Sequence, residues 1–156
     1  MKKRIISITL IVTILFLITS CANPKNKTEV YTFNGEDENI KVNNGLIIVT
    51  DDLEKFIVGD LSFKGEELSD VKHYFAKFFF YKDGDENTIL NNSSTIEGAT
   101  QGQRIHSELG SISSEDLFYG KDLELIKESL NFSLSGKLMN GESFKYNLTL
   151  NVKDAY

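Results

Sequence analysis

The two histidines, His73 and His106, are the first candidates for chemistry in this 156-residue sequence. A Ser-His-Asp hydrolase needs a serine held beside a histidine, yet the chain contains no Gly-x-Ser-x-Gly elbow. His106, Ser107 and Glu108 are consecutive, and consecutive residues of a strand point to opposite faces of the sheet. The sequence therefore favours a protein that is not an enzyme, with a cell-envelope hydrolase as an alternative.

Acidic side chains offer a second kind of chemistry, because carboxylate and amide oxygens are the ligands that Ca²⁺ prefers. One predicted turn contains four candidate metal ligands, Asp83, Asp85, Glu86 and Asn87. Their spacing departs from an EF-hand loop, since Gly84 separates the first two acids. A solvated hairpin turn accounts for the same residues. We therefore predict no cofactor and keep a Ca²⁺-binding sandwich as an alternative.

Aromatic side chains are the third candidate group. Five of them could line a ligand-binding patch: Tyr31, Tyr74, Tyr81, Phe118 and Tyr119. Aromatic residues in strands are more often part of a core. From Cys21 onward the chain carries 14 basic and 23 acidic side chains, a formal charge of −9. This charge and the lack of a basic stripe exclude nucleic acid as an expected partner.

The N-terminal segment predicts export from the cytoplasm. Lys2, Lys3 and Arg4 precede an uncharged, apolar run from Ile5 to Ile18. This run is shorter than the roughly 20 residues that a membrane-spanning helix needs. A short apolar segment behind basic residues is typical of a signal peptide.

The end of this segment, Ile18-Thr19-Ser20-Cys21, resembles the lipobox of bacterial lipoproteins. The resemblance implies that residues 1–20 are a signal peptide that is removed, and that Cys21 carries the lipid, a diacylglyceryl group with acyl chains such as palmitate. Two acyl chains hold a protein stably at a membrane. We therefore expect a protein anchored to the outer face of the cell membrane, with residues 21–28 as lipidated cysteine and flexible tether. Cys21 is the only cysteine, which excludes an internal disulfide.

Residues 29–156 read as a single domain in which strand signals dominate. We predict a strand at Val30–Phe33 and a hairpin in which Ile40–Val42 and Leu46–Thr50 flank Asn43-Asn44-Gly45. A further run, Phe56–Phe63, is interrupted by Gly59. The aromatic run Val71–Tyr81 has apolar residues at both parities, which predicts a central strand covered on both faces.

The last two strands predict a hairpin in a definite register. Apolar residues occupy even positions from Leu130 to Leu138 and again from Phe144 to Val152. Even positions oppose even positions only with a three-residue loop, Met139-Asn140-Gly141, in which Gly141 is left-handed. This register places Phe144 opposite Gly136, and pairs Phe132 with Leu148 and Leu130 with Leu150.

The elements together predict an all-β fold: an antiparallel β-sandwich of immunoglobulin-like, Greek-key type. Ser113 and Ser114 precede Glu115-Asp116, which predicts one short helical turn near residues 114–119. Residues 122–128 fit either helix or strand. The stretch Tyr31–Asn39 resembles small uncharacterised lipoproteins of clostridia and related Gram-positive bacteria, a resemblance that implies no activity.

The sequence thus favours a membrane-anchored, extracytoplasmic lipoprotein that acts as a binding module rather than a catalyst. Its expected partners are the membrane, through the lipid on Cys21, and an envelope protein, a peptide or a cell-wall polymer. The expected binding face includes the acidic loops at Glu36–Asn39 and Asp83–Asn87.

Overall fold

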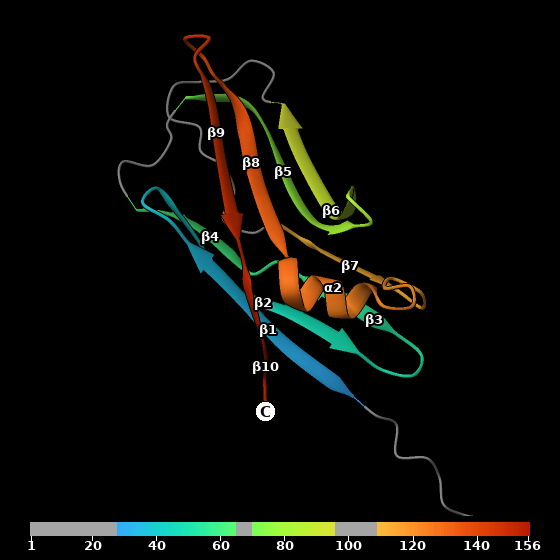
Figure 1. The fold of residues 1–156 in the computed structure, drawn as a ribbon. Coiled ribbons are helices and arrows are strands. Elements are labelled where there is room, and N and C mark those ends of the chain that lie inside the picture. Colours follow the sequence, from blue (N-terminus) through green and yellow to red (C-terminus); the bar gives the residue numbers. More distant parts are fainter. Residues whose placement is uncertain (1–27, 65–69, 96–108) are drawn as a thin grey trace, which may run out of the picture.

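A computed structural model describes residues 28–64, 70–95 and 109–156, which form two antiparallel sheets packed face to face (Figure 1). The elements are β1 (Glu29–Glu36), β2 (Ile40–Val49), β3 (Glu54–Ile57), β4 (Asp60–Phe63), β5 (Val71–Lys82), β6 (Asp85–Thr95), β7 (Ser111–Ser114), α2 (Asp122–Ser129), β8 (Asn131–Leu138), β9 (Ser143–Thr149) and β10 (Asn151–Asp154). The predicted all-β sandwich is confirmed. In these described residues, no helix is long and apolar enough to cross a membrane.

The strand order differs from the predicted immunoglobulin-like order. Sheet A has the order β10-β1-β2-β3-β7, with β4 also paired to β2, and sheet B has the order β6-β5-β8-β9. In an immunoglobulin domain the third strand moves to the second sheet. Here β3 stays beside β2, because a short turn (Thr50–Leu53) brings the chain straight back along the same strand. The first three strands are therefore a meander within sheet A.

The predicted hairpin at Asn43-Asn44-Gly45 is wrong, because these residues lie inside the single strand β2. Asn44 has a φ of 57°, and the pairing with β1 shifts here, so the asparagines form a bulge rather than a turn. Opposite this bulge, Gly59 (φ 76°) separates β3 from β4. The bulge in β2 therefore lies beside the point where the neighbouring chain is interrupted between β3 and β4.

Strand β5 is central in sheet B as predicted, between β6 and β8. Its even-numbered residues Tyr74, Ala76, Phe78 and Phe80 are buried against sheet A. The prediction that both faces are covered is wrong, because Phe75 and Tyr81 on the other face are exposed. Nothing in the described part of the chain forms a third layer over this face.

The C-terminal hairpin has the predicted register. Gly136 pairs with Phe144 and Phe132 with Leu148, and the Leu150 N–H donates to the Leu130 carbonyl oxygen at 2.8 Å. Gly141 has a φ of 89°, as the three-residue loop requires. The predicted pairing is therefore confirmed along the whole hairpin.

The predicted helical turn at residues 114–119 is wrong. Ser111–Ser114 instead pairs with β3 as strand β7, and a turn follows it. The Glu54 carboxylate accepts hydrogen bonds from the Leu117 and Phe118 N–H groups, at 2.7 and 2.6 Å, and so satisfies these amides without a helix. The helix, α2, begins at Asp122 and packs against β5 and β10 through buried Ile126.

The two sheets are joined by a cluster of phenylalanine rings. Phe33 and Phe56 come from sheet A and stack with centroids 4.9 Å apart. Phe78 of sheet B lies 5.5 Å from Phe56 and 4.7 Å from Phe132. All four rings are almost fully buried. The sandwich is thus held by aromatic packing across its interface.

Candidate binding face

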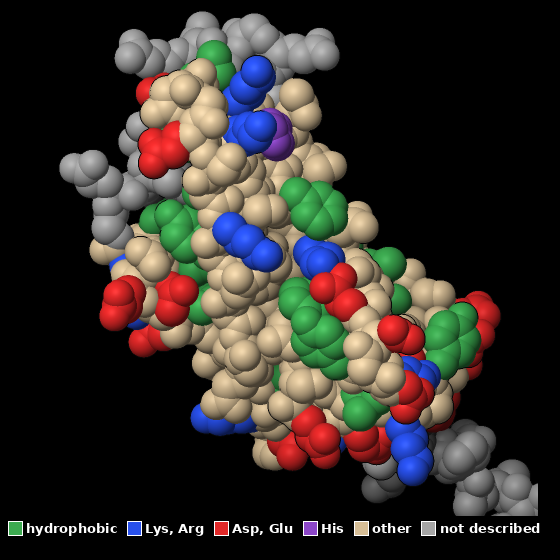
Figure 2. Space-filling view, turned by 45° about the horizontal axis from the view of Figure 1, so that its top comes forward, with side chains coloured by type: hydrophobic (Ala, Val, Ile, Leu, Met, Phe, Trp, Pro, Cys, Tyr) green, Lys and Arg blue, Asp and Glu red, His purple; other side chains and the backbone are tan. Residues whose placement is uncertain are grey.

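The outer face of sheet B is the surface that β5, β6, β8 and β9 turn away from sheet A. Its members, assigned from strand register and parity, are Glu86, Thr88, Asn91, Ser93 and Thr95 of β6; His73, Phe75, Lys77, Phe79 and Tyr81 of β5; Asn131, Ser133, Ser135 and Lys137 of β8; and Ser143, Lys145, Asn147 and Thr149 of β9. Figure 2 shows hydrophobic, lysine, acidic and histidine side chains separated by backbone and other side chains.

A line of aromatic side chains follows β5 across this face. Phe75, Phe79 and Tyr81 share one parity, with Lys77 between the first two, and residues two apart in a strand are about 7 Å apart. Phe75 is 39% and Tyr81 50% exposed, whereas Phe79 is 8% exposed. Phe79 and Tyr81 meet edge to face, with ring centroids 5.6 Å apart. The rings at the two ends of the line, Phe75 and Tyr81, are therefore accessible to a ligand.

Lys77 explains why Phe79 is covered. Its ammonium lies 4.7 Å from the centre of the Phe79 ring and also pairs with the Glu86 carboxylate of β6. A cation above an aromatic face is attracted by the ring quadrupole. The Lys77–Glu86 pair therefore lies across the aromatic line and divides Phe75 from Tyr81.

Short polar side chains surround the aromatic line. Thr149 donates to the Asn131 side-chain oxygen at 3.2 Å, and the Asn131 amide donates to the Ser129 carbonyl at 2.6 Å, so this pair is already satisfied. The others make no side-chain hydrogen bond to any described residue: Asn91, Ser93, Ser133, Ser135 and Asn147. Their hydroxyl and amide groups are available to a ligand.

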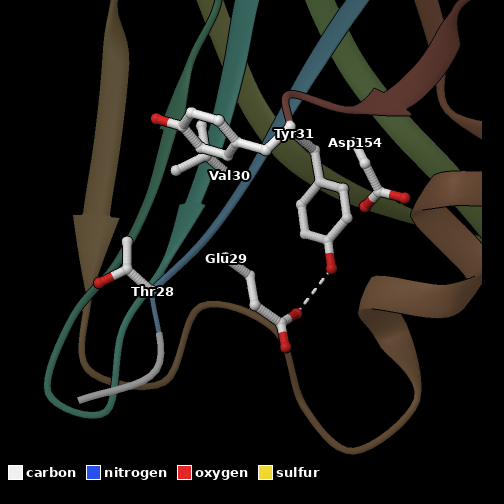
Figure 3. A pocket seen from close by; sticks show the side chains of 6 residues that line it. Thr28, Glu29, Val30, Tyr31 and Asp154 are labelled. Carbon is white, nitrogen blue, oxygen red and sulfur yellow. Dashed lines mark hydrogen bonds between the residues drawn. The ribbon is translucent and has the colours of Figure 1, made fainter. Parts of the chain in front are cut away.

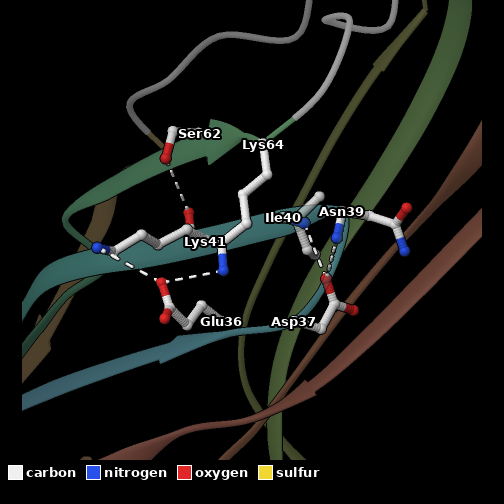
Figure 4. Close-up of polar contacts among 7 residues, drawn as sticks. All are labelled: Glu36, Asp37, Asn39, Ile40, Lys41, Ser62 and Lys64. Carbon is white, nitrogen blue, oxygen red and sulfur yellow. Dashed lines mark hydrogen bonds and ion pairs between the residues drawn. The ribbon is translucent and has the colours of Figure 1, made fainter.

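The acidic loop Glu36–Asn39 uses its carboxylates within the fold (Figure 4). Glu36 pairs with Lys64 at 3.2 Å and Lys41 at 3.5 Å, and these lysines, Lys64 first, lower the pKa of its carboxyl group. Asp37 accepts hydrogen bonds from the Asn39 and Ile40 N–H groups at 2.7 and 2.8 Å. The loop is a structural turn, and its carboxylates stabilise the entry to β2.

The second acidic segment forms a hairpin turn and the start of a strand. Asp83 (φ 56°) and Gly84 (φ 89°) are the two turn residues, and Asp85, Glu86 and Asn87 begin β6. The strand turns Asp85 and Glu86 to opposite faces, and Glu86 pairs with Lys77. The described residues contain no group of three or more His, Cys, Asp or Glu side chains that could hold a metal ion.

Two other predicted site residues lie outside the described residues, namely Cys21 and His106. His73 lies on the outer face of sheet B, opposite Thr95 on one side and Lys137 on the other. No serine is its direct cross-strand partner in either pairing.

The five predicted aromatic residues do not form one patch. Tyr31, Tyr74 and Phe118 are buried in the hydrophobic cluster, whereas Tyr81 and Tyr119 are exposed. Phe75 and the polar residues around it were not among the residues predicted to form a site. The odd-numbered residues from His73 to Tyr81 share one face of the strand, which could have indicated this surface. Most of the even-numbered positions are also aromatic, however, so the alternation is not visible in the sequence.

A pocket of about 260 Å³ lies at the start of β1 (Figure 3). Its lining consists of Thr28, Glu29, Val30, Tyr31, Asp154 and Tyr156. The Tyr31 hydroxyl donates to Glu29 at 2.6 Å, and the Lys127 ammonium lies 4.5 Å from the centre of the Tyr31 ring. The hydrogen bond to Glu29, followed by burial, raises the pKa of Tyr31 to about 12. This network joins β1 to α2.

The raised pKa of Tyr31 predicts a loss of stability at alkaline pH. The ordinary pKa is 10.0 and the folded value is about 12, so the stabilisation is complete below pH 10 and is lost as pH rises through 12. We expect a loss of about 1–2 kcal/mol, reduced by solvent at the pocket. Urea unfolding of the wild type and of Tyr31→Phe over this range measures it. Parallel curves for the two proteins would contradict the assignment.

Comparisons with known proteins found no matching family model, no matching curated protein and no matching solved structure.

Proposed function

We propose that this protein is a lipid-anchored, non-catalytic binding module at the outer face of the cell membrane. The observation that carries the proposal is the aromatic line on the outer face of sheet B, where Phe75 and Tyr81 are exposed. The rings of this line follow one another along one strand, and apolar groups gathered at an exposed surface commonly mark an interaction site. The ligand-binding surface is therefore this sheet face and not the acidic loops.

The chemistry of the face fits an extended polysaccharide. Aromatic rings pack against the C–H faces of sugar rings, and short hydroxyl and amide groups exchange hydrogen bonds with sugar hydroxyls. Phe75 and Tyr81 supply the first kind of contact, and Asn91, Ser133 and Asn147 the second. A face that spans four strands suits a polymer that lies across it, so we assign the ligand to the cell-wall polymers.

The position of the face suits a membrane-anchored protein. The β8–β9 turn and the start of β1 lie at opposite ends of the molecule (Figure 1). Only six residues separate Thr28 from Cys21. A lipid on Cys21 therefore places the β1 end toward the membrane and the β8–β9 end away from it, within reach of envelope polymers.

The anchor is tested by cell fractionation. The lipobox resemblance predicts that the wild type sediments with the membrane and that Cys21→Ser does not, because two acyl chains hold a protein stably at a bilayer. The lipid is checked by mass spectrometry of the N-terminal peptide. Equal membrane association of both proteins would contradict lipid anchoring through Cys21.

Binding is tested with the double variant Phe75→Ala/Tyr81→Ala. Removing both exposed rings should weaken sedimentation with purified cell-wall material at least about ten-fold, since each buried aromatic contact contributes on the order of 1 kcal/mol. The thermal midpoint should change little, because both side chains face solvent. Leu53→Ala, which removes an exposed apolar side chain beside sheet A, is the matched control. Unchanged wall binding in the double variant would overturn the proposal.

A further inference from the structure

The charge on the outer face of sheet B identifies the class of polysaccharide. We propose that the ligand is an anionic polysaccharide, bound by Lys137 and Lys145 beside the ring of Phe75. This inference rests on the proposed function, because it adds the charge of the ligand to a face already assigned to a polymer.

The two lysines lie in adjacent cross-strand rows at one end of the face. The first row contains Thr95, His73, Lys137 and Ser143, and the second contains Ser93, Phe75, Ser135 and Lys145. Neighbouring strands are about 4.8 Å apart, and successive rows on one face are about 7 Å apart. Lys137 and Lys145 are therefore diagonal neighbours, within reach of charged groups on one polymer chain.

These lysines have no acidic partner. The single acidic residue among the assigned members of the face is Glu86, which pairs with Lys77 and lies opposite Tyr81, three rows from Phe75. Neither Lys137 nor Lys145 forms an ion pair with any described residue. On other surfaces, acidic residues lie close enough to pair with lysines: Glu36 pairs with Lys41 and Lys64, and Asp122 pairs with Lys82.

The contrast with the rest of the chain gives the face its selectivity. From Cys21 onward the formal charge is −9, from 14 basic and 23 acidic residues, so the domain as a whole repels polyanions. The two adjacent rows described above contain two unpaired lysines and no carboxylate. An anionic chain can therefore approach the protein there. Ser135 lies directly opposite Lys145, and Phe75 lies on the other side of Ser135, so these two residues supply the hydroxyl and ring contacts that a polysaccharide requires.

The charge of the ligand is tested with two probes that share a sugar backbone. Polygalacturonate carries carboxylates, whereas its fully methyl-esterified form is neutral. Binding of each to the purified full-length lipoprotein in non-ionic detergent is measured by affinity electrophoresis and by calorimetry at two salt concentrations. We expect polygalacturonate to bind on the order of ten-fold more tightly than the ester, with a preference that salt reduces.

Variants separate this inference from the proposed function. Lys137→Gln/Lys145→Gln should remove the preference for polygalacturonate and leave binding of the ester unchanged, whereas the control Lys121→Gln/Lys153→Gln should keep the preference. Equal binding of both probes by the wild type, lost in Phe75→Ala/Tyr81→Ala, would overturn the anionic ligand and leave the polymer-binding function standing. Absence of binding to both probes, together with unchanged cell-wall binding in the aromatic variant, would overturn both.

Discussion

Phe78→Ala should lower the free energy of unfolding by about 3–5 kcal/mol, the usual cost of deleting a buried aromatic ring. Phe78 lies in β5 between the sheets and contacts rings from both, with centroids 5.5 Å from Phe56 and 4.7 Å from Phe132. The ring of Phe33 is a third neighbour, with its centroid 6.1 Å away, and none of the three rings can move into the space without breaking its own contacts. Urea unfolding measures the change against a typical total stability of about 5–15 kcal/mol.

The same strand supplies the matched control. Phe75 lies three residues away but on the outer face, 39% exposed, so Phe75→Ala should cost no more than about 1 kcal/mol. The two variants remove the same ring from opposite faces of β5. Similar losses of stability would contradict the assignment of inner and outer faces, and with it the location of the binding surface.

Gly59→Ala should destabilise the protein by at least about 3 kcal/mol, for two reasons that add. Gly59 has a φ of 76°, which disfavours any side chain. A methyl group there would also overlap the carbonyl oxygen of Asn43 and lie 2.6 Å from the carbonyl carbon of Asn44. Both contacts are backbone atoms of the β2 bulge, which cannot move aside without breaking the pairing of sheet A.

Gly84→Ala separates these two reasons. Gly84 also has a positive φ, 89°, but an added methyl group there meets nothing within 4 Å. It should therefore cost only the conformational penalty of about 1–2 kcal/mol. If thermal and urea unfolding give equal losses for the two variants, then β2 does not approach Gly59 as closely as described.

The C-terminal hairpin was predictable because its information is local. Alternation in both strands, a left-handed Gly141 and an aromatic opposite Gly136 all require one register. The Asn43-Asn44-Gly45 segment contains similar turn-forming residues, but it forms a bulge within β2 and not a hairpin turn. There the neighbouring strand β1 continues past it, and the ring of Phe33 occupies the space that a side chain on Gly45 would need. The choice between turn and bulge thus depends on a strand that lies elsewhere in the sequence.

The region after β7 was not predictable for a related reason. Ser113 and Ser114 are good helix N-cap residues, but Glu54, more than sixty residues earlier, accepts the hydrogen bonds of the Leu117 and Phe118 amides. A partner so distant in sequence leaves no local signal. Helix α2 therefore begins later, at Asp122, whose side chain accepts from the Tyr119 N–H and pairs with Lys82.

The candidate site likewise combines features that are visible in the sequence with features that depend on residues distant in the sequence. The acidic loops were predicted to form part of the binding face. In the structure, however, Glu36 forms ion pairs with lysines, and Asp37 accepts hydrogen bonds from backbone amides of its own turn. The outer face of sheet B is assembled from four strands, of which β6 and β9 are not neighbours in the chain or in the sheet. Its aromatic residues are visible in the sequence, but its polar surroundings emerge only once the strands are in register.

The central claim, that a polymer binds the outer face of sheet B, is tested most directly by mapping contacts in solution. Amide chemical shifts of the ¹⁵N-labelled protein are followed during titration with short polygalacturonate fragments. The largest changes are expected along β5, β8 and β9, around Phe75, Ser135 and Lys145. Changes confined to the Glu36–Asn39 loop or to the pocket at Tyr31 would contradict the claim.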